Sequence, residues 1–474
     1  MNFPDKGKSR EDLLKELVDA KSDDLKWQSG RSFCLVYDPG EEYAELVKEA
    51  YNLYFTENAL NPTSFPSLRR FEAEVVSMMA NLLHGNLEVT GSLTSGGTES
   101  ILMAIKTARD YSKKTKGIDN PEIILPITAH PAFEKAFHYF GIKGVHIPVD
   151  DDYLVDTAAI KAHINPNTIM IVGSAPAYPH GGIDPISEMG KIAIKHELLF
   201  HVDACIGGMM LPFLRELGHH IPSFDFLVPG VTSISADLHK YGYAAKGASV
   251  ILYKNKALRK FQFSVYTKWP GGVYGSPTIA GSKPGGAIAA AWAALNGIGK
   301  DGYLKLTDRA IQATLLIRKG IEKFEDFEIM GEPKGCIIAF NSPTLDMYQI
   351  ADELNLRGWN FERLQRPPGI HLTVSQTHLD LVDDFLDDLS SSVEQVKKLS
   401  LGKINTAIQT ATIKRLVKIL PNGLIAKLQK QFSGNAALKN DRTAAMYGMM
   451  GVISGEDLDE IVLDLLDKLN GLDE

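Results

Sequence analysis

Residues 168–204 decide the fold. Two apolar runs, TIMIVGS (168–174) and LLFHVDA (198–204), flank an amphipathic segment, ISEMGKIAIKHE (186–197). Short runs of β-branched and apolar residues are typical of buried strands, and apolar residues at three- and four-residue intervals are typical of helices. The order strand, helix, strand predicts a parallel pair of strands joined by a crossover helix.

The same alternation extends outward to about residue 300. Further strands are predicted at EIILPI (122–127), VTSIS (231–235) and SVILY (249–253), and a helix at SILMAIKTARDYSKK (100–114). Near-continuous apolar strands are typical of a parallel sheet that is covered on both faces. Ligands bind such sheets at the carboxyl ends of the strands, so the functional residues are expected there.

Three parts of the chain are expected. Residues 1–60 contain two amphipathic segments and predict a helical arm, and residues 61–300 form the large domain with the mainly parallel sheet. Residues 301–474 lose the regular alternation: a long helical segment precedes the strand-like GCIIAF (335–340) and GIHLTV (369–374). This predicts a smaller α+β C-terminal domain.

Composition narrows the functional classes. The 474 residues are 44% hydrophobic and 23% charged, with a formal net charge of −8, which disfavours a nucleic-acid partner. Three scattered cysteines do not form a disulfide framework or a metal cluster, so no metal is expected. Without an apolar run of about 18 residues or a secretory signal at the start, the expectation is a soluble, cytoplasmic protein.

The stretch GSLTSGGTES (91–100) places two glycines directly before a predicted helix. Glycines let backbone N–H groups approach a ligand, and a helix N-terminus attracts anions. This favours a phosphate-binding cradle. A capped helix after a tight turn explains the same residues equally well.

Asp203 ends the strand LLFHVDA. A carboxylate at the end of a buried strand needs a partner, because an unpaired buried charge is costly. A magnesium ion, a ribose hydroxyl and a protonated ring nitrogen all fit, and so does a structural role with backbone donors.

Two lysines, Lys240 and Lys246, lie among small residues in SISADLHKYGYAAKG (233–247). In a partly desolvated site Lys240 is expected to have a lowered pKa and to attack carbonyls to form a Schiff base. On its own it would be read as a surface lysine in a loop. Together, the cradle, Asp203 and Lys240 are what pyridoxal 5'-phosphate requires: a phosphate site, a partner for the ring nitrogen and an amine for the aldehyde.

These motifs, with GSPTIAGSKPGG (275–286), resemble the sphingosine-1-phosphate lyases within the group II pyridoxal-phosphate-dependent decarboxylases. The resemblance runs from about Gly30 to residue 395 and resumes at AAMYGMMG (444–451). It implies a type I aminotransferase-like α/β fold and a homodimer with shared active sites. It also implies retro-aldol cleavage of a phosphorylated sphingoid base to a long-chain aldehyde and phosphoethanolamine.

The resemblance also implies roles for individual residues. Catalysis falls to Lys240, to Tyr178 in SAPAYPHGGIDP and to His130 in TAHPAF, the histidine that stacks on the cofactor ring. The other cofactor contacts are Asp203, Gly97, Thr98 and His239, with Gly281 and Ser282 reaching the partner subunit's cofactor. The substrate phosphate falls to Lys246, helped by Tyr37, Asn58 and Asn61.

Two competing interpretations stay open. An amino-acid decarboxylase would use the same cofactor and release carbon dioxide instead of an aldehyde. A catalytically silent scaffold or a nucleotide-binding module is the alternative from another class, although TSGGTES matches neither G-x-G-x-x-G nor a Walker loop.

The sequence departs from the family at several positions. FCLVYDPG (33–40) replaces a run of smaller residues, Asn61 replaces a phosphate-binding histidine, and Lys283 replaces an arginine. A missing membrane-spanning N-terminus indicates a bacterial, soluble form, and leaves export to a host cell open. The basic, aliphatic segment 403–432 favours either a helix packed on the core or transient contact with an anionic membrane surface.

Overall fold

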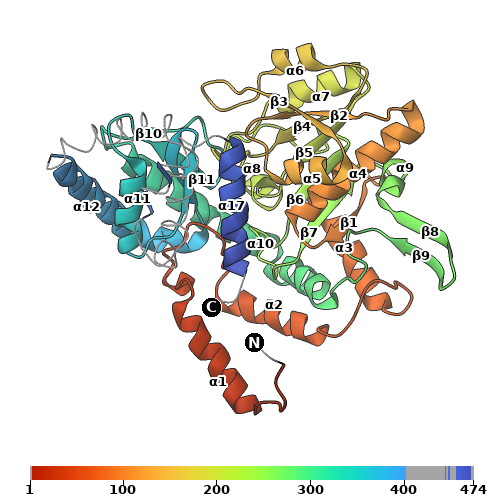
Figure 1. The fold of residues 1–474 in the computed structure, drawn as a ribbon, viewed down its shortest axis with the longest axis horizontal. Helices are drawn as coiled ribbons and strands as arrows, with labels where there is room; N and C mark the ends of the chain where they lie inside the picture. The colour runs from red at the N-terminus through yellow and green to blue at the C-terminus, as the bar shows by residue number, and fades with distance from the viewer. Residues whose placement is uncertain (1–2, 402–442, 445–446, 449–454, 471–474) are drawn as a thin grey trace.

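The computed structural model describes residues 3–401, 443–444, 447–448 and 455–470. A seven-stranded sheet lies at its centre, in the order β1-β7-β6-β5-β4-β2-β3 (Figure 1). The pairs β2–β3, β2–β4, β4–β5 and β5–β6 are all parallel, so the predicted mainly parallel sheet is confirmed. The strands are β1 (Thr90–Thr94), β2 (Glu122–Pro126), β3 (Lys143–Ile147), β4 (Thr168–Ser174), β5 (Leu199–Asp203), β6 (Ser233–Asp237) and β7 (Ser249–Tyr253).

The direction of β7 differs from the expectation that SVILY extends the parallel set. This strand is antiparallel to both β6 and β1. Residues 238–248 connect β6 to β7 without a helix, whereas a parallel pair needs a crossover of about a dozen residues or more, usually with a helix. The short connection turns the chain straight back, and both Lys240 and Lys246 lie in it.

Helices cover both faces of the sheet, as the apolar strands predicted. Alternate strand residues face two separate cores: Ile124 and Phe200 belong to one, Ile123 and Leu199 to the other. The first core is closed by α3 (Pro66–Leu82), α7 (Ile186–Lys195) and α10 (Gly285–Ile321), and the second by α4 (Gly97–Lys116) and α5 (Ala132–Phe140). Shorter helices are α6 (Thr157–His163), α9 (Lys256–Arg259) and α8 (Leu211–Glu216), the last of which is largely buried in the first core.

A second, four-stranded antiparallel sheet lies beside the first. Its order is β10-β11-β13-β12, and α10 reaches it from the large sheet after a kink at Gly299. The predicted domain boundary at residue 300 falls at this kink, and the three-part division stays a prediction. The elements are β10 (Glu328–Ile329), β11 (Ile337–Asn341), α11 (Met347–Leu356), β12 (Glu362–Gln365), β13 (Pro368–Thr373), α12 (Val382–Leu401) and α17 (Gly455–Asn470).

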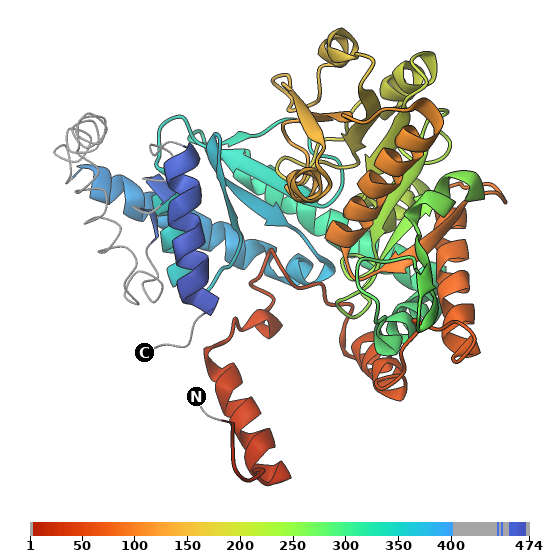
Figure 2. The same cartoon turned by 45° about the vertical axis from the view of Figure 1, so that its right-hand side comes forward.

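Two elements project from the body. Figure 2 shows α1 (Arg10–Ala20) standing apart, with none of its residues buried, while α2 (Glu41–Leu53) packs along α10. The hairpin of β8 (Ser264–Trp269) and β9 (Gly272–Ser276) is exposed along most of its length.

Within the described residues, no helix is long and apolar enough to cross a bilayer. The segment 403–432 lies outside the described residues, so its membrane contact stays a prediction.

Candidate active site

The polar residues of β5 and β6 share one face of the sheet. Side chains alternate along a strand, and Val202 and Ile234 belong to the core under α3, α7 and α10. Their neighbours therefore face the side covered by α4. These neighbours are His201, Asp203, Ser233, Ser235 and Asp237, and all five are buried.

Asp203 is held by two donors at the end of β5. Its Oδ1 accepts hydrogen bonds from the Cys205 backbone N–H (3.0 Å) and the Ser235 hydroxyl (3.3 Å). The Ser235 oxygen also lies 3.2 Å from His201 Nε2. Burial lowers the pKa of His201 to about 4, so its ring is neutral at pH 7. This network fixes the direction of the Asp203 carboxylate.

The glycine-rich stretch forms the start of α4, directly above this face. A Cβ added to Gly97 would lie 2.8 Å from both carboxylate oxygens of Asp237 and from Cys205 Sγ, so no larger residue fits without displacement. A Cβ on Gly96 would lie 3.6 Å from the His239 ring. Gly97 and His239, both predicted phosphate contacts, therefore lie close together, and Thr98 follows in the exposed first turn.

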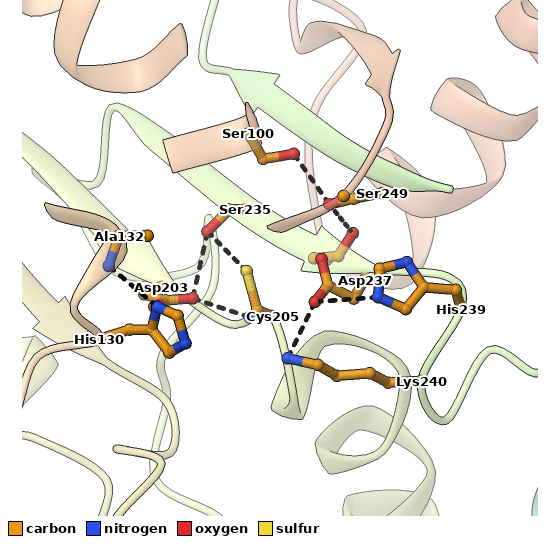
Figure 3. Close-up of polar contacts among 12 residues, drawn as sticks. Ser100, His130, Ala132, Asp203, Cys205, Ser235, Asp237, His239, Lys240 and Ser249 are labelled. Carbon is orange, nitrogen blue, oxygen red and sulfur yellow. Dashed lines mark hydrogen bonds and ion pairs between the residues drawn. The ribbon is translucent and has the colours of Figure 1, made fainter. Parts of the chain in front are cut away.

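Lys240 points back toward the ends of β5 and β6 (Figure 3). Its Nζ lies 2.9 Å from Asp237 Oδ2, and only 22% of the side chain is exposed. Burial opposes the charge, but attraction to Asp237 outweighs it and raises the pKa of Lys240 above the ordinary lysine value. The expected lowering of this pKa is therefore wrong for the chain without its cofactor.

Asp237 is a candidate site residue that sequence reasoning missed. It is 2% exposed, and its Oδ2 also lies 3.9 Å from His239 Nε2. A signal was present: residues 233, 235 and 237 alternate along one strand toward the same face as Asp203, and Asp237 precedes the lysine by three residues.

Lys246 lies at the surface, yet its ammonium is turned inward. Its Nζ donates to the His239 carbonyl (3.2 Å) and lies 5.3 Å from the centre of the Tyr37 ring. Partial burial, reinforced by the nearby charge of Lys240, lowers the pKa of Lys246. Tyr37 itself packs edge-on against Tyr241, and burial raises its pKa to about 12. The structure thus brings Lys246 and Tyr37 together, as predicted for substrate binding.

His130 lies beside Asp203, and Tyr178 is its aromatic neighbour. His130 Nδ1 accepts the Ala132 backbone N–H (3.1 Å), so the neutral ring carries its proton on Nε2. The ring centroids of His130 and Tyr178 are 6.4 Å apart, and His371 packs 4.4 Å from Tyr178 on its other side. Burial lowers the pKa of His130 and raises the pKa of Tyr178.

The remaining predicted residues form a separate group. Asn58 donates to the Ser282 hydroxyl (3.4 Å) and accepts the Lys283 N–H (3.0 Å), while Asn61 accepts the N–H and hydroxyl of Thr63. Gly281 and Lys283 line a cavity of about 730 Å³ beside α3. Among the described contacts, none joins this group to Lys240 or Lys246.

One residue links the two groups. Glu99, in the first turn of α4, accepts the Ser95 N–H and the Ile279 N–H, both at 2.7 Å. The loop that carries Gly281 and Ser282 is thereby tied to the glycine-rich start of α4.

These residues fit pyridoxal phosphate. An amine and a fixed carboxylate face the same space beside Cys205 (Figure 3), and Gly97, where a Cβ would clash, keeps the N-terminus of α4 open. No group of three or more metal-ligating side chains is found among the described residues.

Comparison with known proteins agrees with this assignment. A family model for the pyridoxal-dependent decarboxylase conserved domain matches residues 1–342. The chain therefore belongs to the pyridoxal-dependent decarboxylase family, and pyridoxal 5'-phosphate is its cofactor. Within that family, its place is among the sphingosine-1-phosphate lyases.

Three relatives carry this placement. The sphingosine-1-phosphate lyase of Arabidopsis thaliana is 46% identical over 395 residues, which are 81% of this chain and 72% of that protein. A probable sphingosine-1-phosphate lyase of Legionella pneumophila is 36% identical and is covered to 70%, with 89% of this chain aligned. The structure of a Burkholderia pseudomallei sphingosine-1-phosphate lyase is 39% identical, has a TM-score of 0.82, and covers 86% of this chain and 96% of that one.

The amino-acid decarboxylases are more distant. A glutamate decarboxylase of Lactobacillus brevis has a TM-score of 0.73 but only 22% identity, covering 84% of this chain and 95% of that one. This similarity shows the shared type I fold alone.

Proposed function

We propose that the chain cleaves sphingosine 1-phosphate between C2 and C3 and releases a long-chain aldehyde and phosphoethanolamine. The observation that carries this proposal is the pair of lysines in one connection. Lys240 points into the space that the fixed Asp203 carboxylate also faces, and Lys246 lies nearer the surface with its ammonium over the Tyr37 ring. One lysine suits an aldehyde cofactor and the other suits a phosphate, which matches a phosphorylated amine substrate.

Bound pyridoxal phosphate supplies an electrophilic carbon for amines and a ring that withdraws electrons from the bond that breaks. Lys240 is assigned to the aldehyde and Asp203 to the ring nitrogen, whose positive charge a fixed carboxylate stabilises. His130 is assigned to the ring face. Gly97, Thr98 and His239 are assigned to the phosphate, at the positive end of α4.

Lys246 and Tyr37 are assigned to the substrate phosphate, with Asn58 and Asn61 as further contacts. A phosphate anchored at a fixed distance from Lys240 orients the substrate, so that the C2–C3 bond rather than another is the one cleaved. The exposed setting of Lys246 leaves room for the lipid chain to approach from the surface.

Tyr178 is assigned to proton transfer at the reacting carbons. Because burial raises its pKa, the phenol keeps its proton near neutral pH. It therefore suits donation of a proton to C2 after cleavage better than removal of the proton from the C3 hydroxyl.

The active enzyme is further proposed to be a homodimer in which Gly281 and Ser282 reach the partner subunit's cofactor. The absence of described contacts from these residues to Lys240 supports this, as does the exposed hairpin with Val265, Trp269 and Val273. Sedimentation that finds only monomers of the cofactor-loaded, active protein would contradict it.

The product distinguishes the proposed function from its alternatives. Purified enzyme is expected to release aldehyde and phosphoethanolamine from sphingosine 1-phosphate, with no carbon dioxide from free amino acids. Carbon dioxide release without aldehyde would favour a decarboxylase. Bound cofactor with neither product would favour a catalytically silent protein.

A further inference from the structure

The Asp237 carboxylate stands where the cofactor phosphate is expected. It ends β6 and faces the start of α4, and its two oxygens lie within 2.8 Å of the position of a Cβ on Gly97 (Figure 3). The first N–H groups of a helix attract negative charge. A carboxylate of the chain therefore lies at the anion-binding end of α4.

One oxygen of this carboxylate, Asp237 Oδ1, is buried and lies in hydrogen-bonding geometry with no donor in the described part of the chain. The neighbouring Ser249 hydroxyl helps to lower the pKa of Asp237, but it is directed at the Ala236 carbonyl (3.1 Å). A buried acceptor without a donor destabilises the fold unless the position serves a ligand.

The other oxygen holds Lys240, with Nζ at 2.9 Å from Oδ2. Asp237 is the carboxylate in contact with this lysine among the described residues. The other titratable groups that act on the ammonium are neutral or cationic side chains: Tyr37, His130, Tyr178, Cys205, His239 and Lys246. The Asp203 carboxylate faces the same space, but no described contact joins it to Lys240 (Figure 3).

We propose that Asp237 is an internal counter-ion, which holds Lys240 in its charged form and occupies the phosphate position, and that it thereby slows cofactor loading. This inference rests on the proposed role of Lys240. Only a neutral amine adds to an aldehyde: the ammonium first loses a proton, then the C–N bond forms and the carbonyl oxygen leaves as water. Asp237 opposes the loss of the proton from the Lys240 ammonium, and its negative charge repels the cofactor phosphate at the start of α4.

Two aldehydes separate these effects. Cofactor-free protein is mixed with pyridoxal or with pyridoxal phosphate between pH 6 and 9, and the visible absorbance of the bound aldehyde is followed. Borohydride trapping and mass spectrometry identify the lysine. Asp237→Asn is expected to react with pyridoxal about tenfold faster than wild type at pH 7, since loss of a carboxylate neighbour lowers a lysine pKa by about one unit or more. Its gain with pyridoxal phosphate is expected to be larger.

Asp225→Asn is the matched control. Asp225 is also buried, ion-paired with Arg215 (3.2 Å) and in hydrogen-bond contact with His84 (2.9 Å), but it has no described contact with Lys240. Its loading rate is expected to equal that of wild type. Asp237→Ser repeats the measurement should the asparagine variant fail to fold by circular dichroism.

The outcomes separate this inference from the proposed function. A pyridoxal rate and pH profile unchanged in Asp237→Asn would overturn the counter-ion role. Equal gains for the two aldehydes would contradict the phosphate position of Asp237. If borohydride traps the aldehyde on Lys240→Ala as it does on the wild type, the proposed function would be overturned instead, because another amine would then hold the cofactor.

Discussion

The two ends of the connection between β6 and β7 put the same residue type to different uses. At one end Lys240 is largely buried and its partner is a carboxylate, Asp237. At the other end Lys246 reaches a neutral carbonyl and the face of an aromatic ring. The pKa of Lys240 is raised by its partner, and the pKa of Lys246 is lowered by partial burial and by the charge of Lys240.

The difference shows that the neighbours of a lysine, and not its burial alone, set its chemistry. The more buried lysine is the more firmly charged one, because the attraction of one close carboxylate exceeds the cost of desolvation. Lys246 has no such carboxylate among the described residues, so a bound phosphate would supply the missing negative charge. Substitution of Lys240 and substitution of Lys246 should therefore lower kcat/KM to different extents.

The largest effect is expected at Lys240. Arginine keeps the charge near Asp237 but cannot add to an aldehyde at neutral pH, so Lys240→Arg should lower kcat/KM by at least about 10³-fold, as loss of a covalent catalyst does. Aldehyde release and borohydride trapping measure this. Activity within tenfold of wild type would remove Lys240 from its assigned role.

A smaller and selective effect is expected at Lys246. Lys246→Ala should lower kcat/KM for sphingosine 1-phosphate by about 10- to 100-fold, since a charge-assisted hydrogen bond is lost. The slow reaction of unphosphorylated sphingosine should be unaffected. Lys254→Ala, at another exposed lysine, is the control. Equal losses with both substrates would show that Lys246 does not bind the phosphate.

The smallest effect concerns pH. Because the pKa of Lys246 lies below the ordinary lysine value, its charge is lost earlier as the pH rises. The KM for the phosphorylated substrate is therefore expected to increase a few-fold between about pH 8 and 10 in the wild type. Lys246→Arg stays charged and should give a flat profile. Parallel profiles would assign the pH dependence to another group.

Much of the fold follows from the sequence, because most of the central strands are short runs of β-branched and apolar residues. The runs TIMIVGS and LLFHVDA became β4 and β5 nearly residue for residue, and the mainly parallel α/β fold and the cofactor are confirmed. The direction of β7 was missed, since composition records burial and not pairing. The short connection between residues 237 and 249 is the feature of the sequence that indicates an antiparallel β7.

The sequence predicted which residues come together at the site better than it predicted how their charges interact. Asp203, Gly97, His239 and Lys240 do converge, since Asp203 ends β5, Gly97 begins α4, and His239 and Lys240 follow the end of β6. The sign of the Lys240 shift depends on where the Asp237 side chain points, which is a property of the folded sheet. Asn61, in turn, caps its own turn through Thr63, and its role toward the substrate stays a prediction.

The antiparallel return of β7 has an entropic consequence. Asp237 and Ser249 pair across the β6–β7 ladder, so both ends of the intervening loop are held by the central sheet. Its conformational freedom is given up during folding, before any ligand arrives. Substrate binding at this loop then costs no further conformational entropy, whereas a flexible loop would have to become ordered each time the substrate binds.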